Sequence, residues 1–453
     1  MNPSTAASYQ QIDKSVSESL EQILNTVKPS ELSETLPLFS AFNKVLAQAI
    51  ISPINVPPHN NSAMDGYAFN GQSLDAEELK TPDGIRLKII GETFAGHPFA
   101  PSEPLATLVG VCIKITTGAV MPEGFDTVIP KENCSFNEAT QSIVINDTKI
   151  KTGDNRRLCG EDLQQGLPAL QKGQKLTPAA LGLIASLGIA EVCVMRPLKV
   201  AYFSTGDEIL SLGDLPRHGA VYDSNRYTVF GMLSQLAYEV IDLGCIPDQP
   251  ELLKAAYISA LSQADCIITS GGVSVGEADF TKTMMAELAQ NNTTQTPLGG
   301  VEFWRIAMRP GRPMAFGLLP QYASNFDVEL DPSSHSHSPR MIPVFGLPGN
   351  PVAVMVTFMI FVKAALQKMQ GAISNSPRLI SAISSSAIRK KPGRTEYQRA
   401  FISLENQQNY VKLIGNQGSG VLSSMTTANC LVVLAPEQGN VQEGDWVQVM
   451  LLD

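Results

Sequence analysis

Residues 267–313 carry the clearest indication of the fold of this chain. This stretch begins Ile267-Ile268-Thr269-Ser270-Gly271-Gly272-Val273-Ser274-Val275-Gly276-Glu277-Ala278-Asp279 and ends Arg305-Ile306-Ala307-Met308-Arg309-Pro310-Gly311-Arg312-Pro313. Its first residues close a short apolar run typical of a buried strand, and the glycines follow where that strand should end. In a parallel α/β sheet, ligands bind at the carboxyl edge of the strands. The stretch therefore predicts an α/β domain with a ligand site at this edge.

The chemistry of this stretch favours an anion bound together with a metal ion. Gly271 and Gly272 would let backbone N–H groups approach an anion, and Ser270 and Ser274 would add hydroxyl donors. A turn that serves packing alone, and arginines that form a solvated rim, are the alternative interpretations. The occurrence of donors, carboxylates and arginines together favours binding. The charged residues concerned are Glu277, Asp279, Arg305, Arg309 and Arg312.

Strand and helix patterns alternate in the chain before this stretch. Strands are predicted over residues 198–204, 239–246 and 265–269, and helices over 224–238 and 251–262. Repeated β-α units of this kind predict a parallel, doubly wound sheet with right-handed crossovers. The loops at the strand ends then lie along one edge of the sheet. They contribute Asp207, Glu208, Asp248 and the turn Gly346-Leu347-Pro348-Gly349-Asn350-Pro351.

The first part of the chain predicts helices and then an all-β domain. Apolar residues recur on one helical face over 12–27, and a helical register continues over 36–50. Short strand candidates at 87–91, 111–116, 127–130 and 142–146 predict a β domain over 56–149. Within it, Asp65 stands before Gly66 and an aromatic strand, an arrangement that a capped turn would also explain. Thr117, beside a glycine at the end of a strand, is a candidate anion contact.

The remaining segments complete a four-domain organisation. Residues 154–162 are typical of a solvated linker, a helix is predicted from Thr177-Pro178 to residue 188, and residues 319–341 predict an inserted loop. Strand patterns at 399–404, 410–414, 430–435 and 446–451 predict a second β domain, in which Arg394 and Arg399 are candidate anion contacts. The predicted domains are 1–55 together with 150–196, 56–149, 197–373, and 374–453.

Composition excludes several classes of protein. The chain has 453 residues, too many for one hydrophobic core, and its net charge of -10 argues against a general nucleic-acid binder. The seven cysteines include no Cys-x-x-Cys pair, so the sequence indicates neither a disulfide framework nor a zinc site. We expect a cytoplasmic protein, because no secretion signal is visible and the apolar run 351–362 is shorter than the ~20 residues of a membrane span.

Six motifs in one order resemble those of the molybdopterin molybdenumtransferase family, the MoeA proteins of bacteria and the E domain of gephyrin. The resemblance covers essentially the whole chain. The motifs are Ala63-Met64-Asp65-Gly66-Tyr67-Ala68, Thr117-Gly118-Ala119, Ser204-Thr205-Gly206-Asp207-Glu208, Ser270-Gly271-Gly272-Val273-Ser274-Val275-Gly276, Pro310-Gly311-Arg312-Pro313 and Gly346-Leu347-Pro348-Gly349-Asn350-Pro351. The fold class it implies is multidomain: a doubly wound α/β molybdopterin-binding domain, two β-rich domains and a helical or extended N-terminal domain.

The resemblance implies the last step of molybdenum cofactor synthesis, in which molybdate enters adenylylated molybdopterin and AMP is released with the help of Mg²⁺. It also implies a homodimer whose active site is shared between subunits, with molybdopterin adenylyltransferase and molybdoenzyme chaperones as further partners, and no binding to nucleic acid or membrane. The catalytic residues would be Asp65, Glu208, Asp248, Asp279, Arg305 and Arg309, with Glu208 and Asp279 holding the metal. The substrate-binding residues would be Thr117, Ser270, Gly271, Gly272, Ser274, Arg312, Pro348, Gly349, Asn350, Pro351, Arg394 and Arg399.

This chain departs from the family pattern at two places. Arginines stand at 305, 309 and 312 where many members have lysine at one or more positions, and arginine cannot serve there as a general base. The loop 319–341 is also longer than usual. Two other functions stay open: a molybdopterin-binding or scaffold protein without enzymatic activity, and the adenylyltransferase of the same pathway. The carboxylates favour an enzyme, because anion binding without a metal would be weakened by them, and the flanking β domains argue against the adenylyltransferase.

Overall fold

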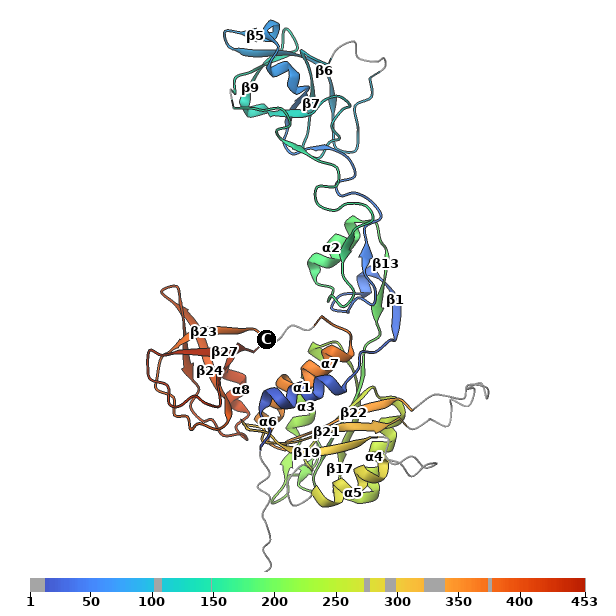
Figure 1. The fold of residues 1–453 in the computed structure, drawn as a ribbon, viewed down its shortest axis with the longest axis vertical. Coiled ribbons are helices and arrows are strands. Elements are labelled where there is room, and N and C mark those ends of the chain that lie inside the picture. The colour runs from blue at the N-terminus through green and yellow to red at the C-terminus, as the bar shows by residue number, and fades with distance from the viewer. Residues whose placement is uncertain are drawn as a thin grey trace, which may run out of the picture.

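The computed structural model describes residues 13–101, 108–147, 149–272, 278–289, 299–321, 339–373 and 377–452, with the side chains of 278–282 excepted. The chain forms an elongated molecule (Figure 1). An outer β domain occupies one end, a small central domain follows, and an α/β domain and a C-terminal β barrel lie together at the other end. The prediction of a multidomain protein with an α/β domain and two β-rich domains is therefore confirmed.

The α/β domain is built on a six-stranded mixed sheet in the order β17-β14-β18-β22-β21-β19. The first four strands are parallel to one another, as predicted, but β21 is antiparallel to both of its neighbours. A short loop over 306–312 joins β19 to β21, and a connection this short permits only antiparallel pairing. The strands are β14 (Lys199–Thr205), β17 (Glu239–Ile246), β18 (Cys266–Ser270), β19 (Gly300–Arg305), β21 (Pro313–Pro320) and β22 (Met341–Leu347).

Helices cover both faces of this sheet, as a doubly wound fold requires. Tyr202 of β14 points into a core shared with one set of helices, and its neighbour Phe203 points into a core on the opposite face. The first set is α1 (Val16–Thr26), α3 (Ser224–Gln235), α6 (Pro351–Thr357) and α7 (Lys363–Met369), and the second is α4 (Pro250–Gln263) and α5 (Ala278–Leu288). Two short strands that pair in parallel, β15 (Ile209–Leu210) and β16 (Val221–Tyr222), follow β14 and precede α3 along the chain.

The helical run Pro351–Met369 is long and apolar enough to cross a membrane by length and composition alone. It consists of α6, a π-helical turn over Phe358–Val362 and α7. Of the described residues, it is the single run that passes this test, and 67% of its apolar window is buried inside the protein. Its side chains form part of the α/β core, so the run is a core helix.

The N-terminal helix is confirmed, but the second predicted helix is wrong. Ser15 and Glu18 form a capping box at the start of α1, which packs on the α/β domain. Residues 36–50 contain the end of β1 (Ser33–Pro37), a 3₁₀ turn over Leu38–Ser40 and irregular chain up to β2 (Ile50–Ile51). Pro37 has no N–H for a helix, and Leu36 pairs instead with Val192.

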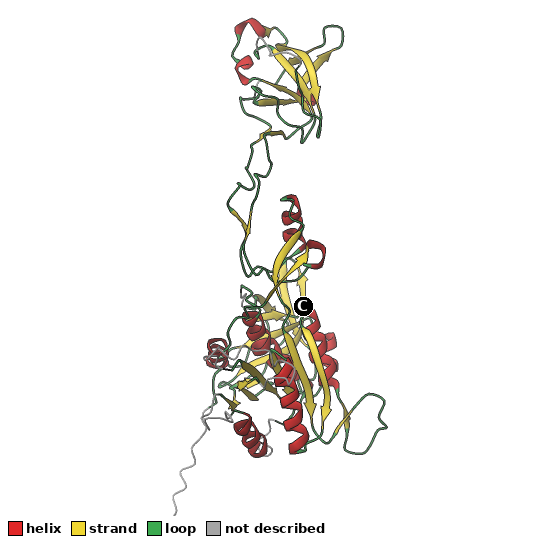
Figure 2. Ribbon diagram, turned by 90° about the vertical axis from the view of Figure 1, so that its right-hand side faces the viewer, coloured by secondary structure: helices red, strands yellow, loops and turns green. Residues whose placement is uncertain are grey.

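The central domain is assembled from two distant parts of the chain. Its pairs are β1 with β13 (Glu191–Met195) and β2 with β12 (Pro168–Leu170), beside the helix α2 (Pro178–Ser186). Beyond it, β3 (Asn61–Ser62) pairs with β11 (Arg156–Arg157), so that two antiparallel segments form a neck to the outer β domain (Figure 2). Residues 154–162, interpreted from the sequence as a linker, thus include a strand of this neck.

The two β domains have separate cores. The outer domain is a seven-stranded sheet of β4 (Gly66–Phe69), β5 (Lys80–Thr81), β6 (Gly84–Thr93), β7 (Val111–Ile115), β8 (Thr127–Pro130), β9 (Cys134–Asn137) and β10 (Ser142–Ile145). The C-terminal barrel comprises β23 (Leu379–Ser384), β24 (Thr395–Glu405), β25 (Gln408–Leu413), β26 (Cys430–Leu434) and β27 (Trp446–Leu451), with α8 (Ser423–Thr427) beside them. β20 (Met308–Arg309) pairs with β24 and so joins the α/β domain to the barrel.

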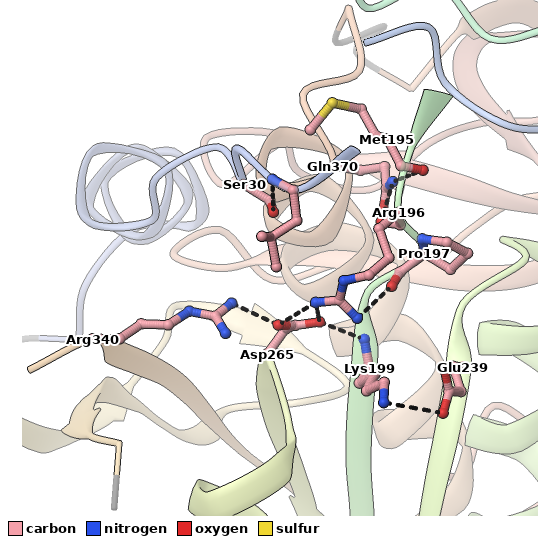
Figure 3. A network of polar contacts seen from close by, with 10 residues as sticks. Ser30, Met195, Arg196, Pro197, Lys199, Glu239, Asp265, Arg340 and Gln370 are labelled. Carbon is pink, nitrogen blue, oxygen red and sulfur yellow. Dashed lines mark hydrogen bonds and ion pairs between the residues drawn. The ribbon is translucent and has the colours of Figure 1, made fainter. Parts of the chain in front are cut away.

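A buried carboxylate joins the central domain to the α/β sheet (Figure 3). Asp265, with 3% of its side chain exposed, accepts hydrogen bonds from Arg196 at 3.0 and 2.9 Å and from Arg340 at 2.6 Å. The backbone N–H of Lys199 donates to the same carboxylate at 2.7 Å. Nearby, the Gln370 amide donates to the carbonyl of Arg196 at 2.9 Å. One side chain therefore fixes the starts of β14, β18 and β22 to the segment that follows β13.

Candidate functional site

A cavity of about 1020 Å³ lies at the carboxyl edge of the parallel strands, where the sequence predicts a site. The α/β domain forms most of its wall, and residues 417–420 of the C-terminal barrel close the opposite side. The predicted site residues that line it are Glu208, Asp248, Ser270, Gly271, Gly272, Arg309, Pro348, Gly349, Asn350 and Pro351. The topology thus brings together most of the predicted residues of the α/β domain.

Gly271 lets the ends of β14 and β18 approach each other. Its φ is 91°, and a Cβ atom there would lie 2.4 Å from the carbonyl oxygen of Thr205. An L side chain is excluded by both the conformation and the contact. The Gly271 N–H donates to the carbonyl of Leu347 at 3.2 Å. This donor, which the sequence suggested for an anion, is therefore used to hold the turn at the end of β22.

A buried network of hydroxyl groups forms the floor of the cavity. The Tyr202 hydroxyl lies 2.9 Å from the Ser204 hydroxyl and 2.7 Å from that of Ser270. Burial raises the pKa of Tyr202, so this phenol keeps its proton at neutral pH. The Asn225 amide donates to the carbonyl of Gly349 at 2.7 Å, which ties α3 to the turn before α6. Ser270 therefore helps to orient the side chains of this floor through its hydrogen bonds to neighbouring hydroxyl groups.

Three buried polar atoms around this floor have no hydrogen-bond partner within the described residues: Thr205 Oγ1, Asp223 Oδ2 and Asn225 Oδ1. All three residues line the cavity. The second oxygen of Asp223 is occupied, because it caps α3 by accepting from the Arg226 N–H at 3.1 Å. Native proteins rarely leave buried polar atoms unpaired, so their clustering at one cavity indicates a ligand or bound water there.

The cavity also gathers negative charge around Cys245. Burial and the nearby carboxylates of Asp223, Glu208 and Asp248 raise the pKa of the Cys245 thiol to about 11. The thiol is therefore protonated at neutral pH and is a poor nucleophile. All three carboxylate residues line the cavity, so its wall carries negative charge.

Two arginines bring positive charge to the side of the cavity that faces the C-terminal barrel. Arg309, on β20, lines the cavity and is exposed. Arg399 is buried beneath the loop 416–420 and donates to the carbonyls of Asn416 at 3.0 Å and Gly418 at 3.1 Å. Burial lowers the pKa of the Arg399 guanidinium, and the positive charge of Arg309 lowers it further by a smaller amount. Of the two predicted arginines, Arg309 faces the cavity and Arg399 shapes the loop that closes it.

Three other predicted arginines lie outside the wall of the cavity. Arg305 and Arg312 both form ion pairs with Asp13, at 3.2 and 2.8 Å. Arg312, which the resemblance assigns to substrate binding, is instead bound by Asp13 through its guanidinium. Arg394 is exposed on the barrel.

Asp65 precedes β4 and Thr117 follows β7, so both belong to the outer β domain, which lies at the opposite end of the molecule from the α/β domain (Figure 1). Thr117 donates to one oxygen of Asp65 through its N–H and its hydroxyl, each at 2.8 Å. These two hydrogen bonds hold the pKa of Asp65 below its usual range, and the bond from the backbone N–H has the larger effect. The outer β domain thus presents an ionised, exposed carboxylate that is remote from the cavity of its own chain.

Two predicted residues cannot be placed in the cavity. Ser274 and the side chain of Asp279 lie outside the described residues, although the backbone of Asp279 begins the first turn of α5. Tyr202, Asp223 and Asn225 were not predicted as site residues from the sequence. The sequence pattern nearest to such a signal is Asp223-Ser224-Asn225 at the start of α3, which indicates a helix cap but gives no sign of a binding site.

The comparisons with known proteins cover almost the whole chain. Residues 14–188 match the model described as "MoeA N-terminal region (domain I and II)". Residues 201–368 match "Probable molybdopterin binding domain", and residues 381–452 match "MoeA C-terminal region (domain IV)". The cavity therefore lies between the second and third of these regions.

Individual relatives agree with these matches. A molybdopterin molybdenumtransferase from Haemophilus influenzae is 40% identical, with 97% of both chains covered. Gephyrin from Dictyostelium discoideum is 29% identical over 97% of this chain and 61% of its own length. The crystal structure of a molybdopterin biosynthesis moeA protein from Pyrococcus horikoshii OT3 is 26% identical, covers 97% of this chain and superposes with a TM-score of 0.76. The chain belongs to the molybdopterin molybdenumtransferase (MoeA) family.

Proposed function

We propose that this chain inserts molybdate into adenylylated molybdopterin and releases AMP. The observation that supports this best is the large cavity at the sheet edge, where unpaired buried oxygens, carboxylates and Arg309 converge. The test is to mix the purified protein with adenylylated molybdopterin, Mg²⁺ and molybdate, and to assay AMP and active cofactor. If neither AMP nor active cofactor forms, while the pterin substrate binds, the proposal is contradicted.

The residues around the cavity fit a divalent cation such as Mg²⁺. The described residues contain no preformed group of three His, Cys, Asp or Glu side chains that could hold a metal. Mg²⁺ does not need one, because it is commonly held by one or two carboxylates and keeps several waters. By the resemblance, Glu208 and Asp279 would hold it. Glu208 lines the cavity together with Asp223, which has an unpaired oxygen, whereas the side chain of Asp279 lies outside the described residues. The bound ion would supply charge neutralisation to the phosphoanhydride oxygens.

The chain's own groups would bind and orient the two anionic substrates. Arg309 offers a planar pair of N–H donors suited to a tetrahedral oxyanion, and the hydroxyl floor orients the turn at 270–272. The described residues that line the cavity include no Cys, His or Lys, so we assign the attack on the phosphoanhydride to a molybdate oxygen or water. Catalysis would then consist mainly of positioning and electrostatic stabilisation.

Arg309→Ala is expected to raise the molybdate concentration needed for AMP release more than it weakens pterin binding. Arg309→Lys should keep part of the activity, because a point charge attracts the oxyanion without the fork geometry. AMP release against molybdate concentration measures the first effect, and calorimetry measures pterin binding. Arg378→Ala, an exposed arginine of the barrel, is the control for lost positive charge. Lost pterin binding with an unchanged molybdate dependence would assign Arg309 to the pterin phosphate instead.

We further propose a homodimer in which the outer β domain of one subunit completes the site of the other. The ionised Asp65 and its partner Thr117 belong to the outer β domain, which lies at the opposite end of the molecule from the α/β domain that forms most of the cavity wall. This arrangement supports a contribution to a second copy. Molybdopterin adenylyltransferase and molybdoenzyme chaperones are the expected further partners, in the cytoplasm. The adenylyltransferase function is disfavoured, because the family matches include the N-terminal and C-terminal regions that flank the α/β domain.

Mixed dimers test the shared site. A chain with Asp65→Ala and a chain with Glu208→Ala should each be inactive alone, whereas a heterodimer of the two should contain about one intact site. AMP release by the mixture, with subunit exchange followed by mass spectrometry, is the measurement. Persistent inactivity in a mixture that demonstrably contains heterodimers would place both residues in one subunit's site.

A further inference from the structure

Two of the three arginines in the segment 305–312 are bound by one carboxylate of the N-terminal segment. Asp13, with 18% of its side chain exposed, accepts from Arg312 Nε at 2.8 Å and from Arg312 Nη2 at 3.1 Å. The Nε of Arg305 lies 3.2 Å from the same carboxylate. The bidentate contact fixes the plane of the Arg312 guanidinium as well as its charge. Asp13 therefore connects the entry and the exit of this segment.

The backbone around Asp13 is paired with the same segment. The Lys14 N–H donates to the carbonyl of Arg305 at 2.8 Å, and the Ala307 N–H donates to the carbonyl of Lys14 at 2.7 Å. The Lys14 ammonium lies 4.2 Å from the centre of the Trp304 ring and 3.3 Å from Glu302. Residues 13 and 14 thus extend the sheet beside β19. This pairing keeps the carboxylate of Asp13 in contact with Arg305 and Arg312.

The chain between these two arginines forms a closed loop with Arg309 near its tip. The Ile306 N–H donates to the carbonyl of Arg312 at 2.8 Å, which closes the base of the loop. At the tip, β20 pairs with β24 of the barrel, and Arg309 lines the cavity. Asp13 thus binds the base on both sides, while the tip reaches the other domain.

We propose that Asp13 is a positioning residue for oxyanion binding and acts through Arg309. By neutralising Arg305 and Arg312 it leaves Arg309 as the arginine of this segment that faces the cavity, and it fixes the loop that presents Arg309. The proposal rests on the proposed function, in which Arg309 binds molybdate. The opposite role would be that of an inhibitor, in which Asp13 withholds Arg305 and Arg312 from the substrate. The paired backbone of residue 14 favours a fixed structural element over a releasable inhibitor.

The test compares Asp13→Asn with wild type in AMP release against molybdate concentration. Asparagine keeps the shape and removes the charge. We expect the half-saturating molybdate concentration to rise about tenfold, the effect of losing a hydrogen bond to a charged group. The rate at saturating molybdate should stay within about twofold, since the reacting groups are untouched. Asp13→Glu should restore part of the affinity. A fall in the half-saturating concentration would show that Asp13 inhibits binding, and would overturn the proposal.

Two further variants separate positioning from general loosening. Lys14→Met removes the contacts to Glu302 and Trp304 from the same segment but leaves both arginines paired, so its molybdate dependence should match wild type. In an Arg309→Ala background, Asp13→Asn should have no additional effect, because a residue that acts through another is silent without it. Additive effects of the two substitutions would overturn the proposal.

Calorimetric titration with molybdate gives the same comparison without catalysis. Asp13→Asn should bind molybdate about tenfold more weakly than wild type, on the same physical ground. A wild-type protein that binds molybdate but releases no AMP would contradict the proposed function while leaving the role of Asp13 intact. Equal molybdate affinities of wild type and Asp13→Asn would overturn the role of Asp13.

Discussion

Replacing Glu208 by glutamine is expected to lower the rate of AMP release by about 100-fold or more, the scale of losing a preorganised charge-stabilising group. Glutamine has nearly the same shape, so the fold should be kept. The carboxylate follows Gly206, where an added Cβ would lie 2.7 Å from Glu208 Oε2, so the glycine makes room for it beside the end of β14. Asp279→Asn is expected to have a similar effect. The measurement is single-turnover AMP release at saturating molybdate.

The control for Glu208→Gln is Glu443→Gln, which removes one exposed carboxylate from the barrel, away from the cavity. It makes the same change in net charge and should leave the rate unchanged. Raising the Mg²⁺ concentration should recover part of the Glu208→Gln activity if the carboxylate holds the metal. A fully active Glu208→Gln protein would remove Glu208 from both the catalytic and the metal assignments.

Asp265→Asn is expected to destabilise the α/β domain by about 3 kcal/mol, near the lower end of the cost of breaking a buried ion pair. The carboxylate is 3% exposed, whereas Arg196 and Arg340 are 28% and 42% exposed, so water compensates the two arginines in part. The amide would also direct N–H donors toward donors, because Arg196, Arg340 and the Lys199 N–H all donate to this position (Figure 3).

Urea unfolding followed by tryptophan fluorescence measures this loss. The chain has two tryptophans, and Trp304 is buried in the α/β core while Trp446 lies on the barrel. In a Trp446→Phe background, the signal reports the α/β domain alone. The matched control is Glu239→Gln, which removes the exposed contact of 3.8 Å between Lys199 and Glu239 and should cost less than about 1 kcal/mol. Equal stabilities of the two variants would show that the Asp265 cluster contributes little.

The parts of the fold with strong periodicity were predictable. The alternation of strands and helices from residue 198 onward predicted three of the four parallel strands, and β17 coincides with its predicted bounds. The antiparallel strand β21 was not expected, because an apolar run carries no sign of its direction. The wrong helix over 36–50 has a similar cause: apolar spacing there fits a helix, but Pro37 and the pairing of β1 with β13 decide otherwise.

The site was predictable where residues follow strands, and not where they depend on distant packing. Ser270 and Glu208 stand at strand ends, which is why topology alone brings them to one edge. The pairing of Arg312 with Asp13 spans 299 positions and involves a segment without any motif. Asp223 was missed because a helix-capping aspartate is ordinary in sequence. Its unpaired oxygen becomes visible only when α3 packs beside the sheet.

The order in which the chain leaves the ribosome gives its interrupted domains a particular folding history. The outer β domain is one continuous segment, and its seven strands and the buried residues of its core are all present once residue 145 has emerged. The central domain must wait for β13, because β1 has no other strand to pair with among the described residues. Asp13 waits longer than β1, since its arginines come 292 and 299 positions later (305 − 13 and 312 − 13). Until β13 has emerged, β1 is therefore a strand without a partner. Unpaired strand edges are the kind of surface that nascent-chain chaperones protect.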